Sequence, residues 1–412
     1  KIVGADKNKD FVLDIQRQSL VLLKNENNLL PLDKNKLSRI LITGPLAKEE
    51  NYMVSRYGPQ ELENITVYEG IKNYLGNKVA VDYALGCKVK DAKWPESEII
   101  HSPLTTEEQQ EIQNAVEKAK LSDIVIAVLG EDEESTGESK SRSGLDLPGR
   151  QQQLLEALYA TGKPIVLVLI NGQPLTINWA DRYIPAILEA WFPGQMGGTA
   201  IAETLFGDYN PGGRLPLTFY NSLSDLPAFD DYNVRNNRTY MYFEGKPLYP
   251  FGYGLSYTDF AYRGLDITQD EENVTVKFCV SNTGNYDGDE VAQVYIQFPD
   301  QGTTLPLKQL KGFKRVHISK GQETEITVRI PKKELRLWSE SNSEFYTPEG
   351  NYIFLVGASS EDIRLQQVVP IRYVSALDTE SLEGVRIFSR DHRIVVIAEN
   401  PVRLDIYGVD GK

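Results

Sequence analysis

Five carboxylates stand within eight residues of one segment of the sequence: Glu131, Asp132, Glu133, Glu134 and Glu138. Like charges held close together raise the pKa of any carboxyl group among them that is partly removed from water. A carboxyl group with a raised pKa stays protonated near neutral pH, so it can serve as a general acid. The alternative is a solvated acidic loop without a catalytic role, and composition alone favours that alternative.

A second candidate segment is aromatic, with YMYF at residues 240–243 and YPFGYGLSY at residues 249–257. Aromatic rings stack on the apolar faces of sugar rings, so this segment could line a sugar site. It could equally join two domains, because aromatic side chains bury large areas when they pack. The size of that buried area favours the joining role.

The acidic segment directly follows one of a series of apolar strands that alternate with helices. We predict strands at 39–43, 79–84, 123–130, 164–170 and 186–191, and helices at 105–119, 151–159 and 198–206. This alternation predicts an α/β sandwich, in which helices flank a mostly parallel sheet, over residues 36–216. In such sheets, sites form outside the carboxyl ends of the strands, which is where the acidic segment stands.

The remaining residues divide by composition and by period. We assign residues 1–35 to a linker that enters the α/β domain, 217–261 to an aromatic-rich connector, 262–372 to a β domain and 373–412 to a C-terminal β-rich extension. The β domain alternates apolar and polar residues with a period of two, which predicts an all-β sandwich of the immunoglobulin type. In the extension, strand-like segments stand at 393–398 and 402–407.

Composition excludes several classes of function. The 412 residues carry a formal net charge of −14, which argues against a nucleic-acid partner or an anionic membrane surface. No apolar run approaches the roughly 18 residues that a membrane span requires. Neither a dinucleotide-binding nor a phosphate-binding glycine pattern follows the first strand at Gly44, and the three histidines stand far apart, so we expect no cofactor and no metal site.

Several short motifs, taken in order along the chain, are together similar to the C-terminal part of glycoside hydrolase family 3. They are SLVLLKN at 19–25, VYEGIK at 67–72, YALGC at 83–87, the acidic segment at 130–142, LPGRQ at 147–151, WFPGQ at 191–195, LFGDYNPGGRLP at 205–216, the aromatic segment at 249–257, NTG at 282–284 and QLKGF at 309–313. The last two resemble the fibronectin type III-like domain of that family. The resemblance covers most of the chain.

Members of this family are exo-acting, retaining glycosidases that remove β-linked sugars from non-reducing ends. Such enzymes use two carboxyl groups about 5–5.5 Å apart, one as nucleophile and one as acid/base. In the family the acid/base is a glutamate on a loop of the α/β sandwich, and the motif GESKSR at 137–142 assigns that role to Glu138. Glu131 competes for the role, but it directly follows the strand, so we expect it to fix the start of the loop near substrate. Arg142 is an expected partner in the site, able to position a carboxylate or a substrate hydroxyl. We expect both Arg142 and Glu131 to bind substrate.

The family's nucleophile is an aspartate on an N-terminal (β/α)8 barrel, and this chain, which begins at Lys1 without an initiator methionine, lacks that barrel. The resemblance therefore implies the C-terminal part of a longer protein, inactive alone, whose partner is the barrel of the same protein. It implies a β-linked oligosaccharide as substrate, with a β-glucosidase favoured over a β-xylosidase. It also implies a periplasmic or extracellular location. The alternative from another class is a non-catalytic module that binds glycan or scaffolds an enzyme.

Overall fold

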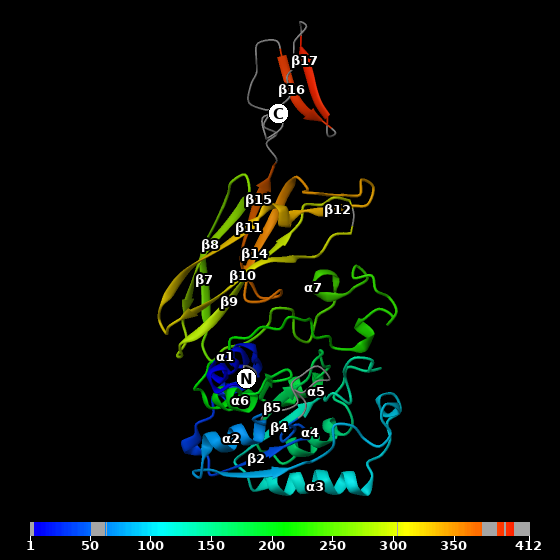
Figure 1. Ribbon diagram of the computed structural model, residues 1–412, viewed down its shortest axis with the longest axis vertical. Coiled ribbons are helices and arrows are strands. Elements are labelled where there is room, and N and C mark those ends of the chain that lie inside the picture. The colour runs from blue at the N-terminus through cyan, green and yellow to red at the C-terminus, as the bar shows by residue number, and fades with distance from the viewer. Residues whose placement is uncertain are drawn as a thin grey trace.

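The computed structural model describes residues 4–50, 62, 64–302, 304–372, 385–390 and 393–398. Along its longest axis lie an α/β unit, a β-sandwich and a separate two-stranded sheet, in that order (Figure 1). The two-stranded sheet pairs β16 (Val385–Arg390) with β17 (Arg393–Ala398), which confirms the strand predicted at 393–398. The strand predicted at 402–407 lies outside the described residues.

The α/β unit is built on a six-stranded sheet with the strand order β1-β6-β5-β4-β2-β3. The strands are β1 (Val21–Asn25), β2 (Arg39–Thr43), β3 (Ala80–Ala84), β4 (Ile124–Gly130), β5 (Ile165–Ile170) and β6 (Ala186–Glu189). All neighbouring pairs are parallel except β1 with β6, so the predicted mostly parallel sheet is confirmed. Every residue of β4 and β5 is buried, which explains their continuously apolar sequences.

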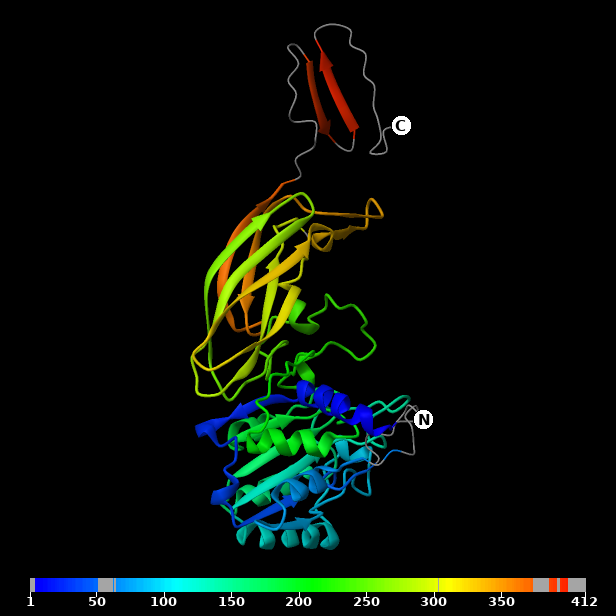
Figure 2. The ribbon, with the colours of Figure 1, turned by 60° about the vertical axis from the view of Figure 1, so that its left-hand side comes forward.

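Helices cover both faces of this sheet (Figure 2). They are α1 (Lys9–Ser19), α2 (Val67–Leu75) and α6 (Gly197–Phe206) on one face, and α3 (Thr106–Lys120), α4 (Gln151–Tyr159) and α5 (Asn178–Tyr183) on the other. The predicted start of α3 is confirmed by a reciprocal cap. The backbone N–H of Glu108 donates to Thr105 Oγ1 at 3.2 Å, and that of Thr105 donates to Glu108 Oε2 at 2.8 Å.

Residues 4–35 are part of the α/β unit, so their assignment to a linker is wrong. Helix α1 packs against α6, and β1 forms an edge strand that aligns Val21 with Glu189 of β6. Val21, Leu22 and Leu23 are buried. The prediction failed because β1 follows α1 and runs antiparallel to β6, which breaks the alternation from which the domain start was placed.

The β domain is a sandwich of two antiparallel sheets, as predicted. One sheet has the order β10-β9-β14-β15 and the other the order β11-β8-β7. The strands are β7 (Phe260–Gln269), β8 (Asn273–Asn282), β9 (Gly288–Gln297), β10 (Gln309–Ile318), β11 (Glu323–Pro331), β14 (Gly350–Gly357) and β15 (Ile363–Ile371), and β12 (Leu337–Ser339) pairs with β13 (Glu344–Tyr346) in a separate hairpin. Inward residues such as Phe278 fill one core, whereas Cys279 lies on the outer side of β8 and is only partly buried.

The connector between the two domains contains the short helix α7 (Thr239–Tyr242) and most of the aromatic segment. The ring of Tyr240 stacks on Phe251 with centroids 4.2 Å apart and meets Tyr295 of the sandwich edge to face at 5.8 Å. On the other side, the Tyr253 hydroxyl donates to the Leu23 carbonyl of β1 at 3.0 Å. These rings therefore join the α/β unit to the sandwich, as their buried area favoured.

Candidate active site

The carboxyl ends of β4, β5 and β6 lie side by side at one edge of the sheet, and a polar residue stands at each end. Glu131 follows β4, Asn171 follows β5, and Glu189 ends β6. All three are buried, and Glu131 Oε2, Asn171 Oδ1 and Glu189 Oε2 have no hydrogen-bond partner among the described residues. Such an edge is where open α/β sheets place their sites.

Gly130, the last residue of β4, lies in close contact with the backbone of β5, where the loop begins. It has a φ of +138°, and a Cβ built there would lie 1.9 Å from the Ile170 carbonyl oxygen, so only glycine fits. The side chain of Gln151, from the LPGRQ motif, bonds both the N–H and the carbonyl of Gly130 at 2.7 Å. The start of the loop at residues 131–150 is therefore fixed by the backbone of β5 on one side and by the side chain of Gln151 on the other.

A buried ion-pair network holds the middle of this loop. The Arg142 guanidinium donates to Glu98 Oε1 at 2.7 Å and to Glu131 Oε1 at 2.6 Å. The side chains of Glu98, Arg142 and Glu131 are 4%, 2% and 0% exposed. We call these three residues the anchor. Two carboxylates and one guanidinium are stable inside a protein only while they remain paired.

Further bonds fix the anchor to its surroundings. Glu98 Oε2 accepts from the N–H of Ser143 at 2.9 Å and from its hydroxyl at 3.0 Å. Gln173, from the segment after β5, donates to Glu131 Oε1 at 2.8 Å. The Arg142 guanidinium lies 5.5 Å from the centre of the Trp94 ring. The anchor thus links the acidic loop to a segment before α3 and to the ends of two strands.

Glu138 lies at the tip of a tight turn formed by residues 137–140. The Lys140 N–H donates to the Gly137 carbonyl at 3.0 Å, and Ser139 adopts a left-handed backbone with φ of +64°. A non-glycine residue in that region is uncommon and marks a turn that its surroundings hold in place. Glu138 is exposed on this turn.

Glu134 and Asp132 of the acidic segment are paired with lysines and with a backbone N–H group, respectively. Lys140 Nζ donates to Glu134 Oε1 at 3.3 Å, and Lys90 Nζ lies 3.5 Å from Glu134 Oε2. The hydrogen bond from Lys140 lowers the pKa of Glu134. Asp132 Oδ1 accepts the Ser135 N–H at 2.8 Å. Glu134 is exposed, so it lies outside the expectation of a raised pKa, which concerned carboxyl groups partly removed from water.

The carboxyl group of Glu189, at the end of β6, has a raised pKa. Complete burial raises the pKa of this carboxyl group to about 8, although a hydrogen bond from the Trp191 N–H opposes the shift. The Glu189 Oε1 atom accepts that bond at 2.8 Å, and Trp191 has a φ of +55°. The neutral acid therefore closes a strained turn at the end of β6.

The structure brings two of the three predicted site residues together and separates the third. Arg142 contacts the carboxylate of Glu131 inside the protein, whereas Glu138 lies on the exposed turn. Sequence analysis missed Glu98 and Glu189. A lone carboxylate within the apolar strand that Glu189 ends was an available signal, but nothing in the irregular segment around Glu98 marked it.

Two structural features are absent from the described residues. No group of three or more histidine, cysteine, aspartate or glutamate side chains in the described ranges is arranged to hold a metal ion. No helix in those ranges is long and apolar enough to cross a membrane.

Comparisons with known proteins match both domains. Residues 20–257 match the glycosyl hydrolase family 3 C-terminal domain, and residues 290–360 match the fibronectin type III-like domain. A beta-xylosidase from Formosa agariphila is 35% identical over 379 residues, which cover 89% of this chain and 50% of the relative. A periplasmic beta-glucosidase from Salmonella typhimurium is 36% identical over 375 residues, which cover 85% of this chain and 48% of the relative.

A solved structure is similar over the same part of the chain. A beta-glucosidase from Erythrobacter marinus superposes with a TM-score of 0.77 at 29% sequence identity, covering 89% of this chain and 51% of its own. The chain spans about half the length of the curated relatives that it matches.

Proposed function

The chain belongs to glycoside hydrolase family 3, and on that basis we propose that it is the C-terminal part of an exo-acting, retaining β-glycosidase. The observation that supports this best is the exposed turn carrying Glu138, at the carboxyl edge of the sheet and tied to it through the buried anchor. A general acid must reach a substrate while its own loop stays fixed, and this loop combines both properties.

In the proposed mechanism Glu138 is the acid/base. It donates a proton to the glycosidic oxygen as the bond to the leaving group breaks, and it later takes a proton from the attacking water. The nucleophile is an aspartate on a (β/α)8 barrel elsewhere in the full-length protein, so the carboxyl group of Glu138 must face outward to meet a substrate held there. The side chains of Arg142 and Glu131 are 2% and 0% exposed, which supports a role for both in positioning the loop.

The proposed substrate is a β-linked oligosaccharide cut at its non-reducing end. The relatives include proteins named beta-glucosidase and beta-xylosidase. We favour a β-glucoside as the substrate, in agreement with the expectation from the sequence. We also propose a periplasmic or extracellular location, which the name of the Salmonella relative supports. The isolated chain should be inactive, because it supplies only one of the two carboxyl groups.

The experiment is Glu138→Gln in the full-length protein. We expect kcat/KM toward cellobiose to fall by about 10²–10⁴-fold, because its alkoxide leaving group needs a proton. The same parameter for a dinitrophenyl β-glucoside should change less than about tenfold, because that leaving group departs unprotonated. Azide should restore turnover of the aryl glycoside, since an anionic nucleophile needs no general base.

The matched control is Glu134→Gln, an acidic residue of the same loop that pairs with Lys140. It should leave both kinetic parameters close to their original values. Equal losses on cellobiose and on the aryl glycoside in Glu138→Gln would contradict the acid role. The non-catalytic module remains the second candidate, and an inactive full-length protein that still binds glycan would favour it.

A further inference from the structure

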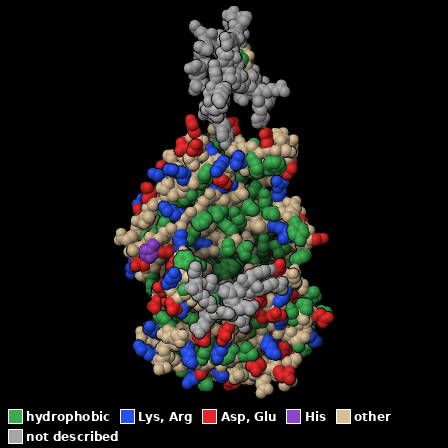
Figure 3. Space-filling model, in the orientation of Figure 1, with side chains coloured by type: hydrophobic (Ala, Val, Ile, Leu, Met, Phe, Trp, Pro, Cys, Tyr) green, Lys and Arg blue, Asp and Glu red, His purple; other side chains and the backbone are tan. Residues whose placement is uncertain are grey.

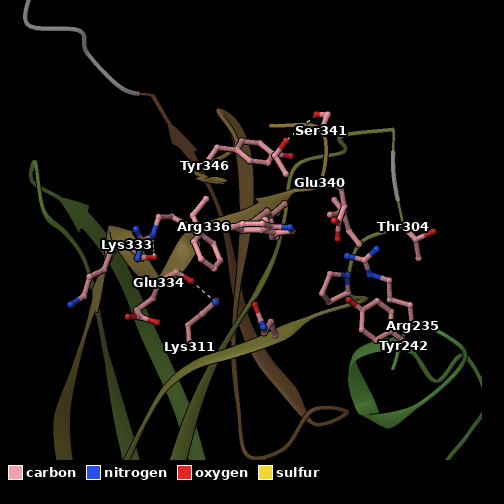
Figure 4. A pocket seen from close by; sticks show the side chains of 17 residues that line it. Arg235, Tyr242, Thr304, Lys311, Lys333, Glu334, Arg336, Glu340, Ser341 and Tyr346 are labelled. Atoms are coloured by element: carbon pink, nitrogen blue, oxygen red, sulfur yellow. Dashed lines mark hydrogen bonds between the residues drawn. The ribbon is translucent and has the colours of Figure 1, made fainter. Parts of the chain in front are cut away.

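A groove of about 750 Å³ lies between the sandwich and the connector, and no residue of the acidic loop lines it. Its walls come from the β12–β13 hairpin, from the start of β10 and from the connector near α7. Hydrophobic side chains gather over this part of the surface (Figure 3). Figure 4 shows the residues that line the groove.

The hairpin presents an aromatic pair to this groove. Trp338 of β12 and Phe345 of β13 are direct cross-strand neighbours, and their ring centroids lie 5.0 Å apart. They are 44% and 61% exposed, which leaves much of both rings in contact with water. The two rings meet edge to face with an interplanar angle of 70°, so each ring presents its own exposed face, of the kind that stacks on a sugar ring.

Basic side chains flank the platform. The Arg336 guanidinium lies 5.4 Å from the centre of the Phe345 ring. Arg235 enters from the connector, on the opposite side of the groove from Arg336 (Figure 4). Lys311 Nζ is occupied by the Glu334 carbonyl, and Lys333 directs its amine away from the other labelled groups in Figure 4. Glu334 and Glu340 also line the groove, so its four cationic and two acidic side chains leave a formal net charge of +2 on a chain whose net charge is −14.

Guanidinium groups bind carboxylates through paired, charge-assisted hydrogen bonds. A local excess of positive charge on an acidic protein selects for a ligand that carries negative charge, because the rest of the surface repels such a ligand. The combination of exposed rings and two arginines thus fits a ligand with both apolar sugar faces and a carboxylate.

We propose that this groove binds an acidic oligosaccharide, with a sugar ring stacked on Trp338 and a uronate carboxylate held by Arg235 or Arg336. The site is separate from Glu138, and it does not depend on the acid/base assignment. It would hold a charged polysaccharide against the protein while other residues act on it.

Calorimetry on the 412-residue chain tests the proposal with two probes. They are xylotetraose carrying one glucuronic acid branch and unbranched xylotetraose. The branched probe should bind at least about tenfold more tightly, and raised salt should reduce the difference. Trp338→Ala should weaken both probes by about tenfold or more, whereas Arg235→Gln and Arg336→Gln should weaken only the branched one.

Two controls keep the test decisive. Phe11→Ala removes a 67% exposed ring from helix α1, which contributes no residue to the groove, and should leave both affinities unchanged. Glu138→Gln should also leave them unchanged, so that failure of this proposal and failure of the acid/base assignment give different results. The arginine variants alter charge without removing the platform, so they remain informative if Trp338→Ala does not fold.

Three results would overturn the proposal. One is the absence of binding by the branched probe at millimolar concentration. Another is equal binding of the two probes. The third is self-association of the chain that Trp338→Ala abolishes, because the groove would then be an interface between copies.

Discussion

The anchor and the turn, which both involve the loop at residues 131–150, differ in the burial of their charged side chains. In the anchor, three ionisable side chains are almost completely removed from water and bonded to one another. In the turn, a few residues away, Glu138 is exposed. Stability should therefore depend on the anchor, and the chemistry we propose should depend on the turn. The predictions below test whether these two properties separate.

The largest effect is expected from Arg142→Met. The substitution leaves the carboxylates of Glu98 and Glu131 buried without a cation, and breaking a buried pair in this way costs about 3–5 kcal/mol. The free energy of unfolding, measured by urea denaturation of the α/β unit's signal, should fall by that amount. A loss of stability of this size would show that the anchor is the part of the loop that stabilises the fold.

The matched control for Arg142→Met is Arg263→Met. Arg263 also pairs with a carboxylate, that of Glu323, but these side chains are 68% and 33% exposed. Exposed pairs contribute about 1 kcal/mol or less, so this variant should be nearly as stable as the parent chain. Similar losses in the two variants would contradict the distinction between anchor and surface pairs.

Much of this architecture could be predicted from the sequence, because a buried segment has an apolar local composition. Strands β4 and β5 are covered on both faces, so their residues are continuously apolar and easily recognised. The capping box at Thr105 fixed the start of α3 in the same local way. Strand β1 escaped notice because its place at the sheet edge depends on β6, far along the chain.

The candidate site was predictable only in part, for a related reason. Glu138 was found through a motif of neighbouring residues. The anchor depends on Glu98, which stands 44 residues before Arg142 in a segment without periodicity, so its pairing is visible only in three dimensions. The sequence indicated only that Arg142 could position a carboxylate or a substrate hydroxyl, and the burial of its guanidinium between Glu98 and Glu131 has no local signal in the sequence.

The second prediction concerns Glu189, the buried acid below the loop. Its pKa is about 8 in the folded protein, above the ordinary value of 4.5 for an unfolded glutamate. Between these two pKa values the unfolded chain loses its proton first, so this group makes stability fall as pH rises from 4.5 toward 8. The loss between pH 4.5 and pH 7 is on the order of 3 kcal/mol.

Glu189→Gln should remove this pH dependence, because the amide cannot ionise and still offers an oxygen to the Trp191 N–H. The difference in unfolding free energy between the variant and the parent chain should therefore grow in favour of the variant as pH rises. Denaturation curves at a series of pH values measure it. A difference that stays constant from pH 4.5 to pH 8 would show that Glu189 is ionised in the folded state.

The smallest effect on stability is expected where the proposed effect on chemistry is greatest. Glu138→Gln replaces an exposed side chain at the tip of the turn, and such substitutions change the free energy of unfolding by about 0.5 kcal/mol or less. Denaturation of the isolated chain, which needs no catalytic partner, measures this directly. A loss as large as that of Arg142→Met would mean that Glu138 belongs to the structural network of the loop, and the separation between anchor and turn would fail.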